Sequence, residues 1–208
     1  MAANVWVFMI QADLPRPELM RFIQRYAFVP AEAGRAALAY APFVTSIFLH
    51  GGLFHLISNM WALWLFADNV EDRLGSARFL FLYLLTGVAA NLAHYFANPA
   101  SSVPTIGASG AIAGVMGAYF LLYPRARIIT LLPVLFYPLI VEIPAAFYLL
   151  VWFATQLINA GAVSAASAVA GGVAWWAHIG GFAAGLAAVI FLKPARRRRS
   201  YEDEYYPW

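Results

Sequence analysis

The sequence contains no cysteine and few charged residues, and each shortage narrows the class of protein. Without cysteine the chain can form no disulfide, perform no thiolate chemistry and bind no metal through sulfur. Charged residues make up 11% of the 208 residues, whereas 63% are hydrophobic and the mean hydropathy is +0.71. A soluble domain of this length does not need so much apolar surface. We therefore predict an integral membrane protein.

Two further absences concern partners and cofactors. The net charge is +3, but the basic residues lie between and after the apolar runs and form no single basic face. We therefore predict no nucleic-acid partner. The metalloprotease signature His-Glu-x-x-His is missing, and no other set of histidines and carboxylates has the spacing of metal ligands. We predict that the chain needs neither a metal nor an organic cofactor.

Long apolar runs organise the chain, with about 20 residues as the length that crosses a bilayer. Five runs qualify: Leu53 to Val70, Phe79 to Ala97, Ile106 to Tyr123, Leu139 to Ile158, and Val173 to Leu192. The stretch Val5 to Ile10 is too short to cross, so either the chain begins partway through a first span or this stretch lies at the membrane interface. We favour a shortened first helix. The predicted fold is all-α, a polytopic membrane helical bundle of five full spans preceded by a short apolar segment.

The basic residues predict how the bundle is oriented. Nine of the thirteen follow the first, third and fifth full spans: Arg73, Arg78, Arg125, Arg127, Lys193 and Arg196 to Arg199. The connections Asn98 to Thr105 and Asn159 to Gly172 carry none, so the arginine side is predicted to be cytoplasmic. The other four, Arg16, Arg21, Arg25 and Arg35, precede the first full span and are expected outside.

This topology divides the chain into three parts. Residues 1–52 hold the short apolar segment and an outer amphipathic loop, which is expected to rest on the outer leaflet. Residues 53–192 form the membrane-embedded core. Residues 193–208 form a cytoplasmic tail of basic and then acidic residues, and its end, Tyr201 to Trp208, has a composition typical of disorder.

Four polar residues then fall at a similar depth, in the outer third of the bilayer. His55 and Asn59 lie near the outer start of the first full span, and their spacing of four places them on one helix face. Ser109 lies near the outer start of the third span, and His178 lies about one and a half turns into the fifth. Polar side chains inside a bilayer are costly and usually functional, so we predict one shared site. The remaining spans contribute His94, which we expect at the interface, and Glu142, which we expect near the cytoplasmic headgroups.

Small residues below the serine and the histidine would let their helices approach closely. The Ser109 helix carries Ala113 and Gly117 four and eight residues on, and the His178 helix carries Gly181 and Gly185 three and seven residues on. Small residues at such spacing allow transmembrane helices to come into backbone contact.

Several motifs together resemble one family. The string HGGLFHLISN, from His50 to Asn59, resembles the His-x4-His-x3-Asn signature of rhomboid intramembrane serine proteases. The string GASG, from Gly107 to Gly110, resembles their Gly-x-Ser-Gly nucleophile motif, and Ala177-His178 resembles their base-bearing helix. Glu71-Asp72-Arg73 matches a Glu-x-Arg that follows the second helix of that family's core. The resemblance covers about Pro42 to Leu192, in the right order. Ala41 and Pro42 depart from it, because many members have a Trp-Arg pair there that braces the outer loop.

The resemblance implies a division of labour at the site. Ser109 would attack a peptide carbonyl and His178 would take its proton, because a serine hydroxyl needs a base within hydrogen-bond reach. No intramembrane aspartate is placed to orient His178, so we expect a dyad oriented by tyrosine or backbone contacts. His55, Asn59 and the N–H of Ser109 would hold the oxyanion. We expect His50, Gly107, Gly110 and Gly181 to shape the site.

The function expected from this resemblance is a hydrolase that cleaves single-pass transmembrane proteins near their outer end. The protein would lie in the bacterial cytoplasmic membrane with the site facing outward. Two other classes stay open: a rhomboid-like protein that binds membrane clients without cutting them, and a small transporter. The first would be expected to lose Ser109 or His178, and the second to show internal repeats and charges at mid-membrane, which we do not find. The oligomeric state and the natural substrate do not follow from the sequence.

Overall fold

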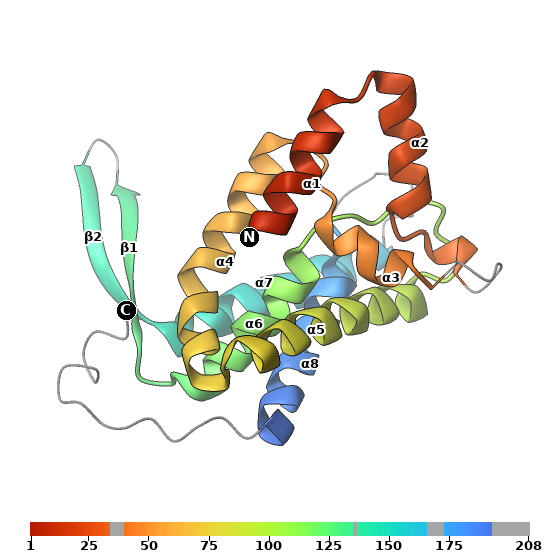
Figure 1. Cartoon of the computed structure of the whole chain (residues 1–208). Helices are drawn as coiled ribbons and strands as arrows, with labels where there is room; N and C mark the ends of the chain where they lie inside the picture. Colours follow the sequence, from red (N-terminus) through yellow and green to blue (C-terminus); the bar gives the residue numbers. More distant parts are fainter. Residues whose placement is uncertain (34–39, 135–136, 166–172, 193–208) are drawn as a thin grey trace.

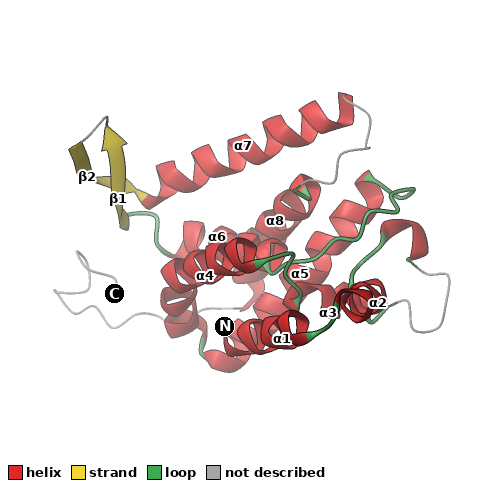
Figure 2. Ribbon diagram, turned by 90° about the horizontal axis from the view of Figure 1, so that it is seen from above, coloured by secondary structure: helices red, strands yellow, loops and turns green. Residues whose placement is uncertain are grey.

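A computed structural model of the chain describes residues 1–33, 40–134, 137–165 and 173–192. These residues form a helical bundle and one two-stranded sheet (Figures 1 and 2). In chain order the elements are α1 (Ala2–Asp13), α2 (Arg16–Tyr26), the 3₁₀ turn η1 (Pro30–Glu32), α3 (Pro42–Thr45), η2 (Ser46–Phe48), α4 (Leu53–Leu74), α5 (Ser76–Ala97), α6 (Ser109–Leu122), β1 (Arg127–Val134), β2 (Tyr137–Pro144), α7 (Ala145–Ala165) and α8 (Trp175–Leu192). The predicted helical bundle is confirmed.

Helix α6 forms the centre of the bundle and carries the candidate nucleophile at its first residue. Every residue from Gly110 to Tyr119 is buried. The helix packs against α4, α5 and α8. A helix that is apolar all round, as this one is, has to be surrounded on every side. Its position places Ser109 where three other helices can reach it.

Helices α6 and α8 meet through their backbones. A Cβ atom added at Gly181 would collide with the carbonyl of Gly110, and one added at Gly185 would collide with the carbonyl of Gly114. Only glycine at these two positions of α8 permits this approach. The close contact that the small-residue spacing predicts is therefore present.

Of the five predicted full spans, three or four are long enough to cross a membrane within the described residues. By length and composition α5, α7 and α8 can each cross a membrane, and α4 qualifies together with the α3–η2 segment (Pro42–Phe48), although the pair bends by 95°. Helix α6 has only 14 residues, which at a rise of about 1.5 Å per residue is shorter than a hydrocarbon core of about 30 Å. If its inner end lies at one membrane surface, Ser109 at its other end lies inside the bilayer.

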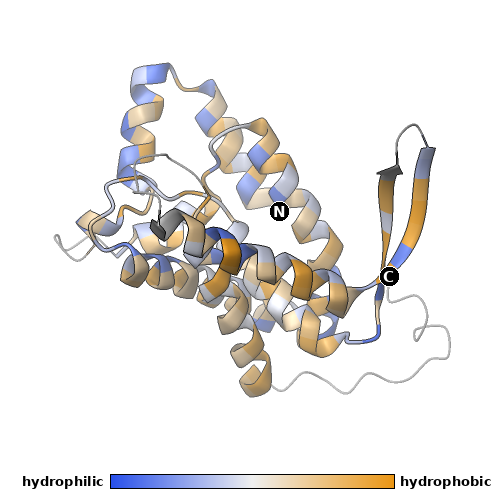
Figure 3. Cartoon of the chain, turned by 180° about the vertical axis from the view of Figure 1, so that it is seen from behind, coloured by the Kyte–Doolittle hydropathy of each residue, from blue (hydrophilic) through white to orange (hydrophobic). Residues whose placement is uncertain are grey.

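The fourth predicted span is wrong at its start. Residues 139–144 belong to β2, which pairs antiparallel with β1 from Arg127 opposite Pro144 to Val134 opposite Tyr137, and α7 begins only at Ala145. Pro138 and Pro144 oppose a helix there, and the branched residues between them favour a strand. A short apolar run does not by itself distinguish strand from helix. Figure 3 shows the two largely hydrophobic strands projecting from the bundle.

This hairpin also corrects the placement of Glu142. We expected it near the cytoplasmic end of a helix, but it lies in β2, and its Oε2 pairs with Nη1 of Arg127 on β1 at 3.2 Å. Both side chains are more than half exposed.

The N-terminal residues form two helices, of which the predicted shortened first helix is present as α1 and the second, α2, replaces the predicted loop. Helix α1 covers the predicted stretch Val5 to Ile10, and α2 is an amphipathic helix that begins with Pro17 in its first turn. The Asn4 side chain of α1 donates a hydrogen bond to the Tyr83 hydroxyl of α5 at 3.2 Å. Helix α1 thus packs against the core. The predicted tail, residues 193–208, lies outside the described residues.

Candidate active site

A glycine before α6 shapes the approach to Ser109. Gly107 has φ +128°, a conformation that favours glycine, and its N–H donates to the Ser46 carbonyl at 3.0 Å. A Cβ at Gly107 would lie 2.8 Å from Nε2 of His55. The glycine therefore brings the chain against His55 just before the helix begins.

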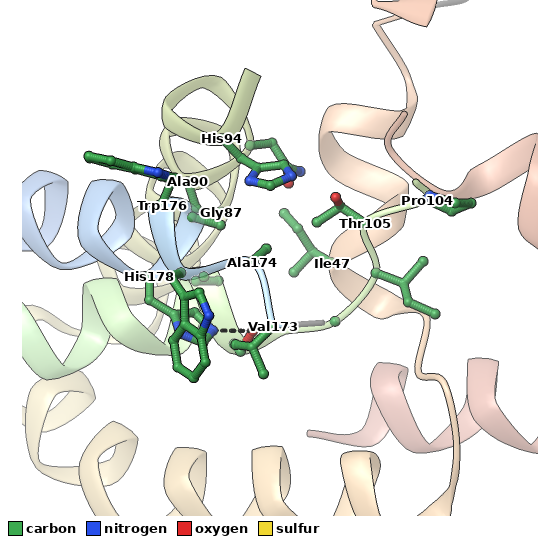
Figure 4. Close-up of a pocket in the computed structure, with 18 of the residues that line it drawn as sticks. Ile47, Gly87, Ala90, His94, Pro104, Thr105, Val173, Ala174, Trp176 and His178 are labelled. Carbon is green, nitrogen blue, oxygen red and sulfur yellow. Dashed lines mark hydrogen bonds between the residues drawn. The ribbon is translucent and has the colours of Figure 1, made fainter. Parts of the chain in front are cut away.

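His178 faces Ser109 from the first turn of α8, nearer the helix start than predicted. Its Nε2 lies 2.8 Å from Oγ of Ser109, so the expected hydrogen bond is present (Figure 4). The imidazole is buried, and the rings of Trp152 and Trp175 lie with their centroids 5.8 and 6.1 Å from its own. The two tryptophan rings pack against the imidazole, whose Nε2 points at the serine.

The second nitrogen of His178 has a partner that sequence reasoning missed. Nδ1 lies 2.8 Å from Oε1 of Gln156, a buried residue of α7. We expected tyrosine or backbone contacts to orient the imidazole, and among the described residues the hydrogen bond comes instead from this amide. The available signal was the short polar group Thr155, Gln156 and Asn159 within an otherwise apolar helix, since polar residues there are rare and usually functional.

His55 and Asn59 lie on one face of α4, as their spacing predicts. The N–H of Gly51 donates to Nδ1 of His55 at 3.3 Å, so the neutral ring carries its proton on Nε2, the atom next to Gly107. Nδ2 of Asn59 donates to the His55 carbonyl at 3.0 Å and has a second N–H. Both side chains line the same cavity as Ser109 and His178. Each residue can thus offer a donor, and the oxyanion role stays a prediction.

His50 packs against His55, and the first helix, α1, forms hydrogen bonds with the His50 backbone. Its ring is buried and meets the His55 ring edge-on, with 5.2 Å between centroids. The side chain of Gln11 on α1 accepts from the His50 N–H at 3.0 Å and donates to the His50 carbonyl at 3.1 Å. Gln11 is a second residue that sequence reasoning missed. It connects α1 to the segment that precedes His55.

Ser109, His178, His55 and Asn59 line a cavity of about 700 Å³, which His50 does not reach. Helix α5 contributes His94, which we had placed at the interface without a role and which lines one wall (Figure 4). Gly110 also lines the cavity, whereas Gly181 lies behind it against the Gly110 carbonyl. Among the described residues no three histidines, aspartates or glutamates are grouped so that they could hold a metal ion.

The fold and the candidate site together indicate the class of protein. Helices long and apolar enough to span a membrane surround a cavity that contains a serine hydrogen-bonded to a histidine. The sequence pattern described as Rhomboid domain matches residues 38–195, which is most of the chain. The chain therefore belongs to the rhomboid family, and it is an integral membrane protein.

Similar proteins come from mitochondria and from bacteria. The chain is 36% identical over 129 residues to the human presenilin-associated rhomboid-like protein, mitochondrial, a match that covers 61% of this chain and 32% of that protein. It is 32% identical over 117 residues to rhomboid protein 1, mitochondrial, of Saccharomyces cerevisiae, with 54% and 33% covered. It is 43% identical over 76 residues to YdcA of Bacillus subtilis, named provisionally as a rhomboid protease, with 36% and 38% covered. The matches thus span about a third of the length of these relatives.

Proposed function

We propose that this chain is an intramembrane serine endopeptidase that cleaves transmembrane helices of membrane proteins. The hydrogen bond of 2.8 Å between Oγ of Ser109 and Nε2 of His178 carries the proposal. It joins a nucleophile and a base from two helices that their glycines bring into backbone contact. Membership of a family that includes named proteases supports the same reaction.

The geometry supports a two-step acyl transfer. Ser109 attacks the scissile carbonyl while its proton passes to Nε2 of His178, and an acyl-enzyme forms as the peptide C–N bond breaks and the leaving amine takes that proton. A water molecule then attacks the acyl-enzyme and gives a proton to His178, and His178 returns this proton to Oγ of Ser109 as the ester C–O bond breaks and the carboxyl product leaves. The cavity around Ser109 provides room for this water inside an otherwise apolar bundle.

Three donors would stabilise the oxyanion. The N–H of Ser109 lies in the first turn of α6, where helix N–H groups have no partner within the helix. Nε2 of His55 and the second N–H of Asn59 complete the set, since both side chains line the cavity. Loss of one such donor typically lowers kcat by about 10²- to 10³-fold.

The substrate class follows from the location of the site. A single-pass transmembrane helix hides its carbonyls in its own hydrogen bonds, so it must unwind before Ser109 can attack. Helix-breaking residues and a small side chain at the cut position are the preferences that the family resemblance implies. We place the site toward the outer side of a cytoplasmic membrane, on the distribution of arginines.

Labelling and cleavage in detergent test this proposal. Wild-type protein is expected to react with a fluorophosphonate and to cut a model transmembrane substrate, and Ser109→Ala and His178→Ala are expected to lower cleavage by at least about 10⁴-fold. Ser102→Ala is the matched control, because Ser102 is exposed and does not line the cavity. The proposal fails if wild type neither reacts nor cleaves. Binding of the substrate without cleavage would instead identify a client-binding protein.

A further inference from the structure

We infer that Gln156 is a positioning residue that holds His178 in the tautomer required for accepting the Ser109 proton. The inference rests on the proposed function and adds a third side chain, which holds the proposed general base His178 in place. Gln156 lies on α7, is only 3% exposed, and places Oε1 2.8 Å from Nδ1 of His178. It therefore meets the imidazole on the nitrogen opposite the serine.

The surroundings of the Gln156 amide decide which of its ends faces the histidine. Its Nε2 lies 2.9 Å from the Trp152 carbonyl and 2.9 Å from Oγ1 of Thr155. The Thr155 hydroxyl donates its only proton to the same Trp152 carbonyl at 2.6 Å. Both neighbouring oxygens are thus acceptors, so the NH₂ group of Gln156 must face them. Turning the amide over would set its oxygen against the Trp152 carbonyl and leave a buried repulsive contact.

The oriented amide then determines the proton positions on the imidazole. An amide oxygen only accepts, so Nδ1 of His178 must carry the ring proton in order to pair with Oε1. A neutral imidazole with its proton on Nδ1 has an unprotonated Nε2. Nε2 is the atom 2.8 Å from Oγ of Ser109, so the base is ready to accept the serine proton.

The same contact persists through the reaction. When Ser109 transfers its proton, Nε2 becomes protonated and the Nδ1–H bond to Oε1 of Gln156 stays in place. The amide oxygen then faces an imidazolium, and hydrogen bonds to charged groups are stronger than neutral ones. When Nε2 gives its proton to the leaving amine, the starting tautomer returns. In acylation the proton thus passes only from Ser109 to Nε2 of His178 and on to the leaving amine.

Substitutions of Gln156 test the inference, with Asn159→Leu as the matched control. Asn159 lies on the same helix, donates to the Thr155 carbonyl and does not line the cavity. We expect Gln156→Leu to lower kcat about 10- to 100-fold with little change in KM, which is less than the full ~10²- to 10⁴-fold contribution of a general base. Asn159→Leu is expected to keep wild-type kcat.

Two readouts separate positioning from a merely structural role. Nitrogen-15 NMR of imidazole-labelled protein, with His178→Ala to assign the signal, should show the proton of His178 on Nδ1 in wild type and a mixture in Gln156→Leu. Gln156→Glu should retain activity and move the acidic limb of the kcat/KM profile to higher pH, because a carboxylate stabilises the imidazolium. The other ionisable side chains lining the cavity, His55 and His94, are unchanged in this variant.

The outcomes distinguish this inference from the function on which it rests. An active wild type whose Gln156→Leu variant keeps either its kcat or its His178 tautomer overturns the role of Gln156 and leaves the protease proposal intact. An unmoved pH profile in Gln156→Glu also counts against it. If wild type is inactive, the protease proposal fails, while the NMR comparison still decides whether Gln156 sets the tautomer.

Discussion

The helices that carry the candidate serine and histidine are joined differently from α1, which packs against η2 and α4, and from α7, which packs against α8. Helices α6 and α8 meet backbone to backbone at Gly181 and Gly185. Helix α1 buries only Asn4 and Gln11, while apolar residues such as Trp6 are exposed. Lipid is as apolar as leucine, so transmembrane helices associate through close packing or polar contacts. The molecule uses glycine-mediated backbone contact at its centre, whereas amide hydrogen bonds attach α1 and reach His178 from α7.

The edge helices nevertheless reach the site, each through one glutamine. Gln11 of α1 holds the backbone of His50, and Gln156 of α7 bonds the ring of His178. Figure 2 shows α7 along one side of the bundle, away from α1. Both contacts end on histidines at the candidate site. The comparison therefore teaches that edge helices without close backbone packing can still set the geometry of the site.

The largest effect is expected from adding one methyl group between the central helices. Gly181→Ala would drive a Cβ into the Gly110 carbonyl, and overpacking of this kind costs about 1–3 kcal/mol. It would also move His178 away from Ser109 and lower cleavage. Gly161→Ala on α7 is the control, because its Cβ meets nothing within 4 Å and alanine favours a helix by up to about 1 kcal/mol. Thermal unfolding in detergent and substrate cleavage are measured for both variants. If Gly181→Ala and Gly161→Ala changed stability and cleavage equally, the proposed difference in packing between the central helices and α7 would be wrong.

A smaller effect is expected from breaking the amide contact of α1. Gln11→Leu removes both hydrogen bonds to the His50 backbone and is expected to cost about 1–2 kcal/mol, because buried polar groups lose their partners. Cleavage should fall as well, since His50 packs against His55. Gln24→Leu on the exposed side of α2 should stay within about 0.5 kcal/mol of wild type. Wild-type cleavage by Gln11→Leu would show that α1 does not act on the site.

The smallest effect is expected at the base of the hairpin. The Arg127 and Glu142 side chains are 65% and 56% exposed, and exposed ion pairs contribute about 0–1 kcal/mol. Arg127→Ala and Glu142→Ala should each lower the unfolding temperature only slightly and leave cleavage unchanged. The double variant should differ little from either. A large, salt-sensitive loss of stability would show that the hairpin belongs to the structural centre.

The apolar runs predicted the helices well where nothing interrupts them. The segments that became α4, α5 and α8 begin and end within a few residues of the structural helices. The prediction failed at residues 139–144, where Pro138 and Pro144 bound a strand, because apolarity measures burial in lipid or protein and does not distinguish backbone conformation. It also treated Arg16–Tyr26 as a loop, although its amphipathic pattern suits a surface helix.

The candidate site, like the fold, was predicted only in part. Motif spacing brought together Ser109, His178, His55 and Asn59, which line one cavity in the structure. No motif pointed to Gln156 or Gln11, because each bonds a residue far away in the sequence and belongs to no local pattern. His94 likewise reaches the cavity only through the packing of α5.

The sequence by itself determined that this is a rhomboid-like membrane protein and predicted a serine and a histidine at a similar depth, because composition and spacing along a helix are local properties. The tertiary structure alone decided which nitrogen of His178 faces Ser109 and what holds the other. That choice depends on how α7 is rotated against α8, and rotation follows from packing between helices. The hydrogen bonds of Gln156 are the clearest product of that packing.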